Sequence, residues 1–190
     1  GAAAAAEGAR RNPLQYGLDA VSGFPYPVIA MIRGYAMGAG LHLAAACDLR
    51  VASPDALFAM PPVKLGIVYP VEGYQLFGRL LGPVHARALF LTGRRFSAEE
   101  ALRMGLVSRL EPAETLEPYV FDLAREMAEE NAPLAMKGAK FILNRLQAGD
   151  LTDEDVSESR RLMARAFQSA DAREARAAFA EKRKPQFSGR

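Results

Sequence analysis

Three glycines stand close together after an apolar run, and their spacing suggests chemistry more clearly than any other feature of the chain. Gly34, Gly38 and Gly40 lie between the run Val28–Ile32 and the Leu- and Ala-rich segment Leu41–Cys47. The run predicts a buried strand, and the segment predicts a helix. A glycine turn between them leaves main-chain N–H groups free at one point, where they can stabilise a developing negative charge. The alternative is a tight strand-to-helix turn that binds nothing.

Three side chains that can exchange protons or hold a charge follow this turn. His42 has an unperturbed pKa near neutrality, and the phenol of Tyr69, with a pKa of about 10, can donate a hydrogen bond or a proton. Glu72 begins a predicted helix and is a candidate base. Each also has a structural interpretation: a packed histidine bonded to a carbonyl, a packed tyrosine, and a carboxylate that complements the helix dipole.

Other glycine-rich sites fit the sequence poorly. A dinucleotide fingerprint needs a third glycine where Leu43 stands, and no Gly-Lys-Ser/Thr sequence marks a P-loop. No serine lies in the glycine segment to act as a nucleophile. Two separated histidines, His42 and His85, and one cysteine do not favour a metal site.

The composition is that of a folded protein and favours no charged partner. Half of the 190 residues are hydrophobic, which argues against disorder, although Gly1–Gly8 is of low complexity. The net charge is only +2, without the basic stripe of a nucleic-acid binder. No apolar run approaches the ~20 residues of a membrane helix, and the single Cys47 excludes a disulfide within the chain. We expect no nucleic-acid or membrane partner and a cytoplasmic location.

Local signals place further elements along the chain. Asp48–Ala52, Phe58–Ala59 and Leu106–Leu110 are predicted strands. Ser97 and Glu100 form a capping box at the start of a helix. The chain is predicted helical from Glu114 onward. The sequence also predicts helices over Leu14–Val21, Glu72–Leu81 and Val84–Leu91, a break at Gly82-Pro83, Pro133 in a first turn, N-caps at Thr152 and Asp171, and a helix end at Gly149.

The order and spacing of these residues resemble the crotonase (enoyl-CoA hydratase/isomerase) superfamily. The resemblance extends from about Tyr26 to Phe187. The matching segments are Pro27–Ala30, Gly34–Gly40, Cys47–Arg50, Phe58, Pro61, Leu65–Gly66, Leu91–Arg95, Ala98–Ala101, Met104–Val107 and Phe179–Phe187. Each segment alone is a weak signal, but together they are specific.

The resemblance implies an α/β fold with two parts. A ββα spiral core would occupy residues 1–112, and a helical region, residues 113–190, would build homotrimers or hexamers. Family members act on acyl-CoA thioesters and hold no permanent cofactor, since coenzyme A is part of the substrate. They also carry a strand–helix half before the first strand, with a Ser-Ala-Gly-x-Asp signature that is absent here. We therefore expect the N-terminal part of the core to be missing from these residues.

The resemblance also assigns binding roles. Beside Gly38, the Ala39 N–H would be one oxyanion donor, directed at a thioester carbonyl. Phe179 and Lys182 match residues that approach the nucleotide of coenzyme A from a neighbouring subunit, and a lysine suits a phosphate partner. The alternative for these two is a solvated helix face. Arg94 and Arg95 are expected only to form structural ion pairs.

The resemblance leaves the reaction open. His42 and Pro62 occupy the positions of the two glutamates of family hydratases, and proline cannot exchange a proton, so ordinary hydration and isomerisation lose support. Leu65–Tyr69 looks like a run in methylmalonyl-CoA decarboxylases, where a tyrosine lies near the substrate carboxylate. Three functions remain: an acyl-CoA enzyme with an oxyanion-stabilised enolate, a decarboxylase of this kind that uses Tyr69, and a non-catalytic acyl-CoA-binding relative. The catalytic candidates are Ala39, His42, Tyr69 and Glu72, and the candidates for binding coenzyme A are Gly38, Phe179 and Lys182.

Overall fold

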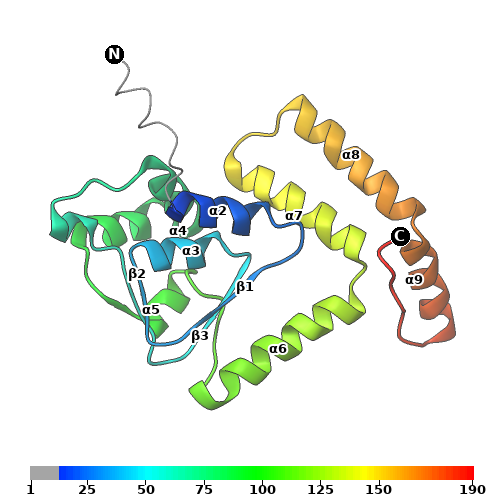
Figure 1. Cartoon of the computed structure of the whole chain (residues 1–190), viewed down its shortest axis with the longest axis horizontal. Helices are drawn as coiled ribbons and strands as arrows, with labels where there is room; N and C mark the ends of the chain where they lie inside the picture. The colour runs from blue at the N-terminus through cyan, green and yellow to red at the C-terminus, as the bar shows by residue number, and fades with distance from the viewer. Residues whose placement is uncertain (1–12) are drawn as a thin grey trace. The chain divides into compact units, whose positions relative to one another are not determined.

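The structure, a computed structural model, describes residues 13–190 and is shown in Figure 1. The low-complexity segment Gly1–Gly8 lies outside the described residues. The chain forms two compact units. Among the described residues, the first unit comprises residues 13–24 and Ala30–Ala113, and the second comprises Pro25–Ile29 and Glu114–Arg190. The predicted division into domains at residue 112 stays a prediction.

The strands form two three-stranded sheets, and the first four alternate between them as the chain advances. One sheet contains, in spatial order, β1 (Ile29–Ile32), β3 (Leu49–Ala52) and β6 (Arg109–Leu110), and the other contains β2 (Tyr35–Met37), β4 (Leu57–Ala59) and β5 (Phe96–Ser97). β3 pairs in parallel with β6, and β2 with β4, whereas β5 runs antiparallel to β4. Two strands followed by a helix thus occur twice, as β1, β2 and α3 (Ala39–Ala46) and as β3, β4 and α4 (Val71–Thr92), in agreement with the predicted spiral, whereas α5 (Ala98–Arg103) separates β5 from β6.

The helices of the first unit connect these strands. They are α2 (Pro13–Gly23), α3 (Ala39–Ala46), the 3₁₀ turn η2 (Pro62–Leu65), α4 (Val71–Thr92) and α5 (Ala98–Arg103). α4 is interrupted at Gly82, whose φ of 70° and ψ of 170° are not helical. A glycine tolerates this positive φ, and Pro83 after it cannot continue the preceding hydrogen-bond ladder. The predicted break between two helices is confirmed there.

Apolar side chains from the sheets and helices of the first unit form one core. Its members come from both sheets and from α3, α4 and α5, so the burial of these side chains fixes the elements relative to one another. The side chains with almost no exposure include Leu41, Phe58, Met60, Phe77, Leu89, Phe96 and Leu106. α3 packs against this core through its own residues Leu41, Ala44 and Ala45, which are buried.

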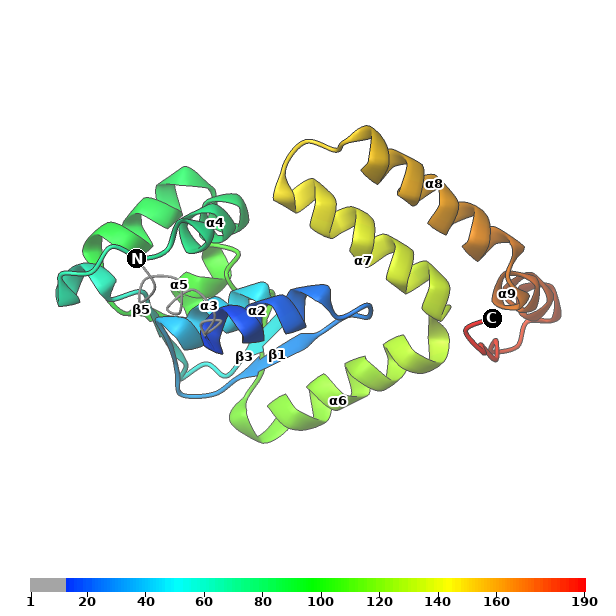
Figure 2. The same cartoon turned by 45° about the horizontal axis from the view of Figure 1, so that its top comes forward.

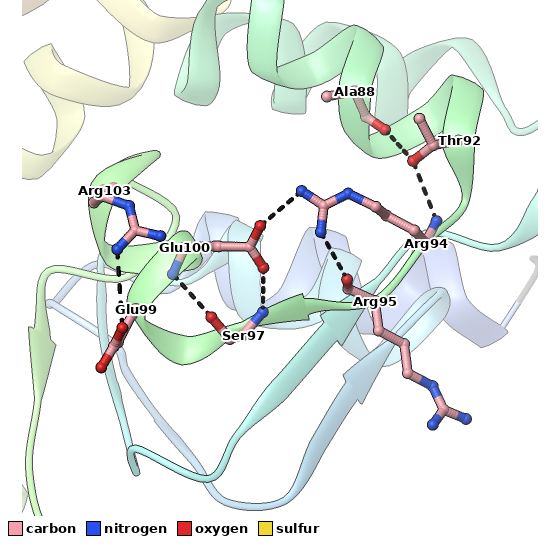
Figure 3. A network of polar contacts seen from close by, with 8 residues as sticks. All are labelled: Ala88, Thr92, Arg94, Arg95, Ser97, Glu99, Glu100 and Arg103. Atoms are coloured by element: carbon pink, nitrogen blue, oxygen red, sulfur yellow. Dashed lines mark hydrogen bonds and ion pairs between the residues drawn. The ribbon is translucent and has the colours of Figure 1, made fainter.

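Polar contacts join the end of α4 to β5 and α5 (Figure 3). Ser97 Oγ accepts from the Glu100 N–H at 3.2 Å, and the Ser97 N–H donates to Glu100 Oε2 at 2.9 Å, which confirms the capping box. Arg94 donates to Glu100 Oε1 at 2.7 Å and lies 3.8 Å over the centre of the Phe96 ring. The Arg94 hydrogen bond is the main reason why the pKa of Glu100 falls to about 2. The structural ion pair expected of Arg94 is confirmed.

Arg50, a buried residue on β3, holds the C-terminal end of α3. Its Nε donates to the Leu106 carbonyl at 2.7 Å, and its Nη1 donates to the Cys47 carbonyl at 2.5 Å. Cys47 is the C-cap of α3, so one guanidinium satisfies a carbonyl at the end of the helix and another beyond α5. The C-terminal end of the short α3 is thereby fixed to β3.

Four helices make up most of the second unit. They are α6 (Ala113–Glu130), α7 (Pro133–Ala148), α8 (Asp153–Gln168) and α9 (Ala170–Glu181), and Figures 1 and 2 both show α7 beside α8. Pro133 begins α7, Gly149 ends it and Thr152 is the N-cap of α8, all as predicted; the structure adds that Asp155 completes a capping box with Thr152. In the described part of the chain, no helix has both the length and the apolar character needed to cross a membrane.

The predicted N-cap at Asp171 is wrong. Ser169 caps α9 instead, and its Oγ accepts from the Ala172 N–H at 3.0 Å. Asp171 is 1% exposed, and its carboxylate accepts from the Ser188 N–H at 2.7 Å and from the Gly189 N–H at 2.8 Å. The sequence favoured Asp171 because aspartate is a common N-cap, but its carboxylate instead binds the returning C-terminal segment.

Two strand predictions also need correction. The glycine turn contains a strand, β2, that pairs with β4; three residues between glycines are too few for strand alternation to be recognised. The predicted strand Leu106–Leu110 shortens to Arg109–Leu110. Its first residues end α5 instead, because the N–H groups of Leu106 and Val107 both donate to the Ala101 carbonyl.

Candidate active site

The glycine turn presents a main-chain donor at the start of α3. Gly38 has a φ of 54°, and its N–H donates to the Ala59 carbonyl of β4 at 2.9 Å, so the turn is tied to the neighbouring strand. The Gly38 carbonyl accepts the first helical bond, from the His42 N–H at 2.9 Å. Ala39 is exposed, and no group in the part of the chain that the structure describes accepts a hydrogen bond from its N–H. This N–H remains available to an anionic group at the positive end of the helix.

His42, in the same helix as this donor, contacts Tyr69. His42 lies three residues after Ala39 in α3, so the two residues share one face of the helix. The Nδ1 atom of His42 is 3.2 Å from the hydroxyl oxygen of Tyr69, and the ring centres are 5.6 Å apart. The structure thus brings together His42 and Tyr69, two of the predicted catalytic residues, which are 27 positions apart in the sequence.

Burial keeps both groups uncharged near neutral pH. It lowers the pKa of His42 and raises the pKa of Tyr69, because in each case it disfavours the charged form. The Tyr69 hydroxyl donates to Nδ1 when the imidazole proton is on Nε2, and Nδ1 donates to the hydroxyl oxygen in the other tautomer.

Glu72 lies in the first turn of α4 with its side chain exposed. Its negative charge raises the pKa of His42, but less strongly than burial lowers it. Glu72 therefore acts on the pair electrostatically, and the position also suits the dipole of α4. Pro62, the other position discussed from the sequence, is buried in η2 and has no side-chain group that can exchange a proton.

Aromatic rings surround the pair on the side of the core. The ring centre of Phe77 lies 6.0 Å from that of His42, and the ring centre of Phe90 lies 6.0 Å from that of Tyr69. Tyr74 packs against Phe90 with 4.4 Å between centres, and its hydroxyl oxygen is 3.4 Å from the Tyr69 main-chain nitrogen. Sequence reasoning did not single out these three residues. Their positions in the sequence predict that they belong to a helix. The sequence does not predict that they contact His42 and Tyr69, because those contacts depend on tertiary packing.

The two candidates near the C-terminus lie on the second unit. Phe179 belongs to α9 and is 88% exposed. Lys182 is the C-cap of α9, with a φ of 55° that is uncommon for a residue with a side chain. In the described residues, no group of three His, Cys, Asp or Glu side chains is placed to hold a metal ion.

Comparison with known sequences decides the family. Residues 2–190 match the profile of the enoyl-CoA hydratase/isomerase family over their whole length. The chain belongs to the enoyl-CoA hydratase/isomerase family. The match reaches further towards the N-terminus than the segments recognised from about Tyr26 onward.

Named relatives and a solved structure agree with this assignment. The chain is 41% identical over 164 residues to a Mycobacterium bovis protein named "Probable enoyl-CoA hydratase echA8", covering 86% of this chain and 63% of that protein. It is 39% identical over 162 residues to the short-chain-enoyl-CoA hydratase of Clostridium acetobutylicum, covering 83% and 60%. An enoyl-CoA hydratase/carnithine racemase from Magnetospirillum magneticum superposes with a TM-score of 0.83 at 33% identity, covering 91% and 63%. The crotonase fold is confirmed, and the chain spans somewhat less than two thirds of these relatives' length.

Proposed function

We propose that the protein is an acyl-CoA thioester enzyme that forms an enolate at the Ala39 N–H and protonates it from Tyr69. The observation that carries this proposal is the 3.2 Å contact between His42 Nδ1 and the Tyr69 hydroxyl, with His42 on the helix that begins at the Ala39 N–H. An oxyanion donor of this kind is worth roughly 3 kcal/mol in the transition state. Gly38 allows the turn that exposes this donor. Coenzyme A enters as part of the substrate.

Decarboxylation is the reaction that these groups support best. Loss of carbon dioxide from a malonyl-type thioester leaves its bonding electrons as an enolate, so no base is needed to remove a proton from carbon. The enolate needs an oxyanion donor and a single proton donor, which are the roles of Ala39 and Tyr69. A phenol that keeps its proton at neutral pH is suited to this task.

Hydration is the second candidate, and the names of the relatives favour it. Adding water across an enoyl thioester requires a group that activates water and another that protonates carbon. A neutral His42 is able to accept a proton from water, with Glu72 stabilising the imidazolium that forms. Proline at position 62 removes the second acid–base group that family hydratases carry there, so Tyr69 would have to supply the proton.

The second unit supplies candidates for binding the nucleotide and for assembly. An exposed aromatic ring and a lysine, Phe179 and Lys182, are chemically suited to an adenine and a phosphate. Met163 and Phe167 on α8 are also largely exposed, which is consistent with the homotrimer or hexamer expected from the family resemblance. Light scattering on the purified protein measures the mass of the assembly directly. A monomer at micromolar concentration would exclude a homotrimer or hexamer.

A competition assay tests the reaction. The purified protein is incubated with methylmalonyl-CoA and crotonyl-CoA together, and the products are identified by mass spectrometry. We expect the first substrate to lose about 44 mass units, the mass of one carbon dioxide, while the second is unchanged. Addition of one water to crotonyl-CoA, with methylmalonyl-CoA unchanged, would replace decarboxylation by hydration. Binding of both thioesters without any turnover would support the binding-only relative instead.

A further inference from the structure

We propose that Gly73 is a positioning residue of this site: because it has no side chain, the ring of Tyr69 can lie against α4 with its hydroxyl beside His42. The proposal rests on the function proposed above for Tyr69. Gly73 is buried in the first turn of α4, four residues after Tyr69. The evidence is the space that its missing side chain leaves.

A side chain at position 73 has no room while Tyr69 keeps its place. An ideal Cβ on Gly73 would lie 2.5 Å from both Cδ1 and Cε1 of the Tyr69 ring. The same Cβ would lie 3.5 Å from Cε1 of His42, which is an ordinary contact. The conflict is therefore with the tyrosine ring alone, and that ring must move if any other residue replaces the glycine.

The backbone at Gly73 does not itself require glycine. Its φ is not positive, so every L-residue can adopt this conformation. Glycine within a helix is less favourable than alanine, by roughly a factor of five in the folding equilibrium. Neither the backbone nor helix propensity explains the glycine, whereas the position of the Tyr69 ring does.

The Tyr69 ring has few ways to avoid a new methyl group. Phe90 packs on it with 6.0 Å between ring centres, and the Tyr69 main-chain nitrogen lies 3.4 Å from the hydroxyl of Tyr74. With the backbone and one side of the ring held, the remaining movement is a rotation that carries the hydroxyl away from His42 Nδ1. A displacement of about 1 Å at a reacting group can cost roughly a hundredfold in rate.

The test compares Gly73→Ala with Gly78→Ala. Gly78 lies in the same helix, and a Cβ there would meet no atom within 4 Å. The readout is NMR with labelled tyrosine and histidine rings, because the chain has only six tyrosines and two histidines. The signal that disappears in Tyr69→Phe is that of Tyr69, and His85 serves as an internal reference for His42.

We expect Gly73→Ala to shift the Tyr69 and His42 signals, to leave His85 unchanged, and to lower kcat by roughly a hundredfold with little change in KM. Gly78→Ala should change neither the spectra nor the rate. Unchanged Tyr69 and His42 signals in Gly73→Ala would overturn the positioning role. Shifted signals with an unchanged rate would support the positioning of the ring but contradict the proposed function of Tyr69, so the two failures are distinguishable.

A second pair of variants covers the case in which Gly73→Ala does not fold. In Tyr69→Ala the ring is gone, and a methyl group at position 73 then meets only the ordinary contact with His42. The double variant Tyr69→Ala/Gly73→Ala should therefore be as stable as Tyr69→Ala alone. If Gly73→Ala is as damaging without the ring as with it, the ring is not the reason for the glycine and the proposal fails.

Discussion

The two units of the chain are stabilised in different ways. Buried apolar side chains fix the first unit, and its core contains almost all of the fully buried large residues. In the second unit, α8 has no buried residue, and ion pairs connect its segments: Arg145 with Asp155, Arg183 with Glu174, and Lys184 with Glu130. The difference has a chemical consequence, because the packed unit is the one that holds the Ala39, His42 and Tyr69 groups in a defined geometry.

The largest effect should come from a core phenylalanine of the first unit. Phe58 on β4 is completely buried, so Phe58→Ala should lower the free energy of unfolding by about 3–5 kcal/mol. The matched change in the second unit is Phe167→Ala on α8, where the ring is 70% exposed; it should change stability by at most about 0.5 kcal/mol. Urea unfolding followed by circular dichroism measures both, since the chain has no tryptophan. Equal losses in the free energy of unfolding of the two variants would contradict the proposed difference between the two units.

A smaller effect is expected from the buried carboxylate of the second unit. Asp171→Ala removes the acceptor of the Ser188 and Gly189 N–H groups and should cost about 1–3 kcal/mol. Hydrogen exchange at these two amides should become faster. Asp122→Ala is the control, because that carboxylate forms an exposed pair with Arg125. Unchanged exchange in Asp171→Ala would show that the carboxylate does not hold the C-terminal segment.

The smallest expected effects are in the pH dependence of stability, which should differ between the two units. Burial lowers the pKa of His42, so its contribution to stability is complete above its unfolded pKa of about 6.5 and is lost as the pH falls below that value. In the second unit, the Arg183 hydrogen bond lowers the pKa of Glu174 to about 2, so its contribution is lost only between about pH 4.5 and 2.

Unfolding at pH 7.5 and 5.5 tests this difference. The wild-type protein should be less stable at pH 5.5, and His42→Gln, which does not titrate, should lose part of that pH dependence. Glu174→Gln should leave the dependence between these two values intact. If His42→Gln shows the same pH dependence as the wild-type protein, burial of the imidazole does not govern stability in this range.

The sequence predicted the glycine turn, α3, the Ser97–Glu100 capping box and the Thr152 N-cap because each depends on a few neighbouring residues. Ser97 and Glu100 are a local pair with a fixed spacing, and this box and the Thr152 cap both proved correct. Asp171 was misassigned because its partners, Ser188 and Gly189, lie 17 and 18 residues away. The same limit applies to the site: His42 and Tyr69 were each chosen as candidates, but their contact depends on how α3 and α4 pack.

Gly73 illustrates a signal that was present in the sequence but not used. A glycine inside a predicted helix, four residues after a candidate tyrosine, is compatible with a neighbour that needs the space, although Gly78 in the same helix has no such neighbour. Which neighbour needs it cannot be read from the sequence, since the ring position follows from Phe90, Tyr74 and His42 together.

The most direct test of the account is the rate of Tyr69→Phe, which keeps the ring and removes only the hydroxyl. We expect turnover of the accepted thioester to fall at least a hundredfold, because a positioned acid contributes roughly 10²–10⁴ in rate, while thioester affinity is retained. The control is Tyr16→Phe on α2, where the ring is exposed, and its rate should equal that of the wild-type protein. If Tyr69→Phe turns over as fast as Tyr16→Phe, the phenol does not supply the proton, and the proposed role of the His42–Tyr69 pair is wrong.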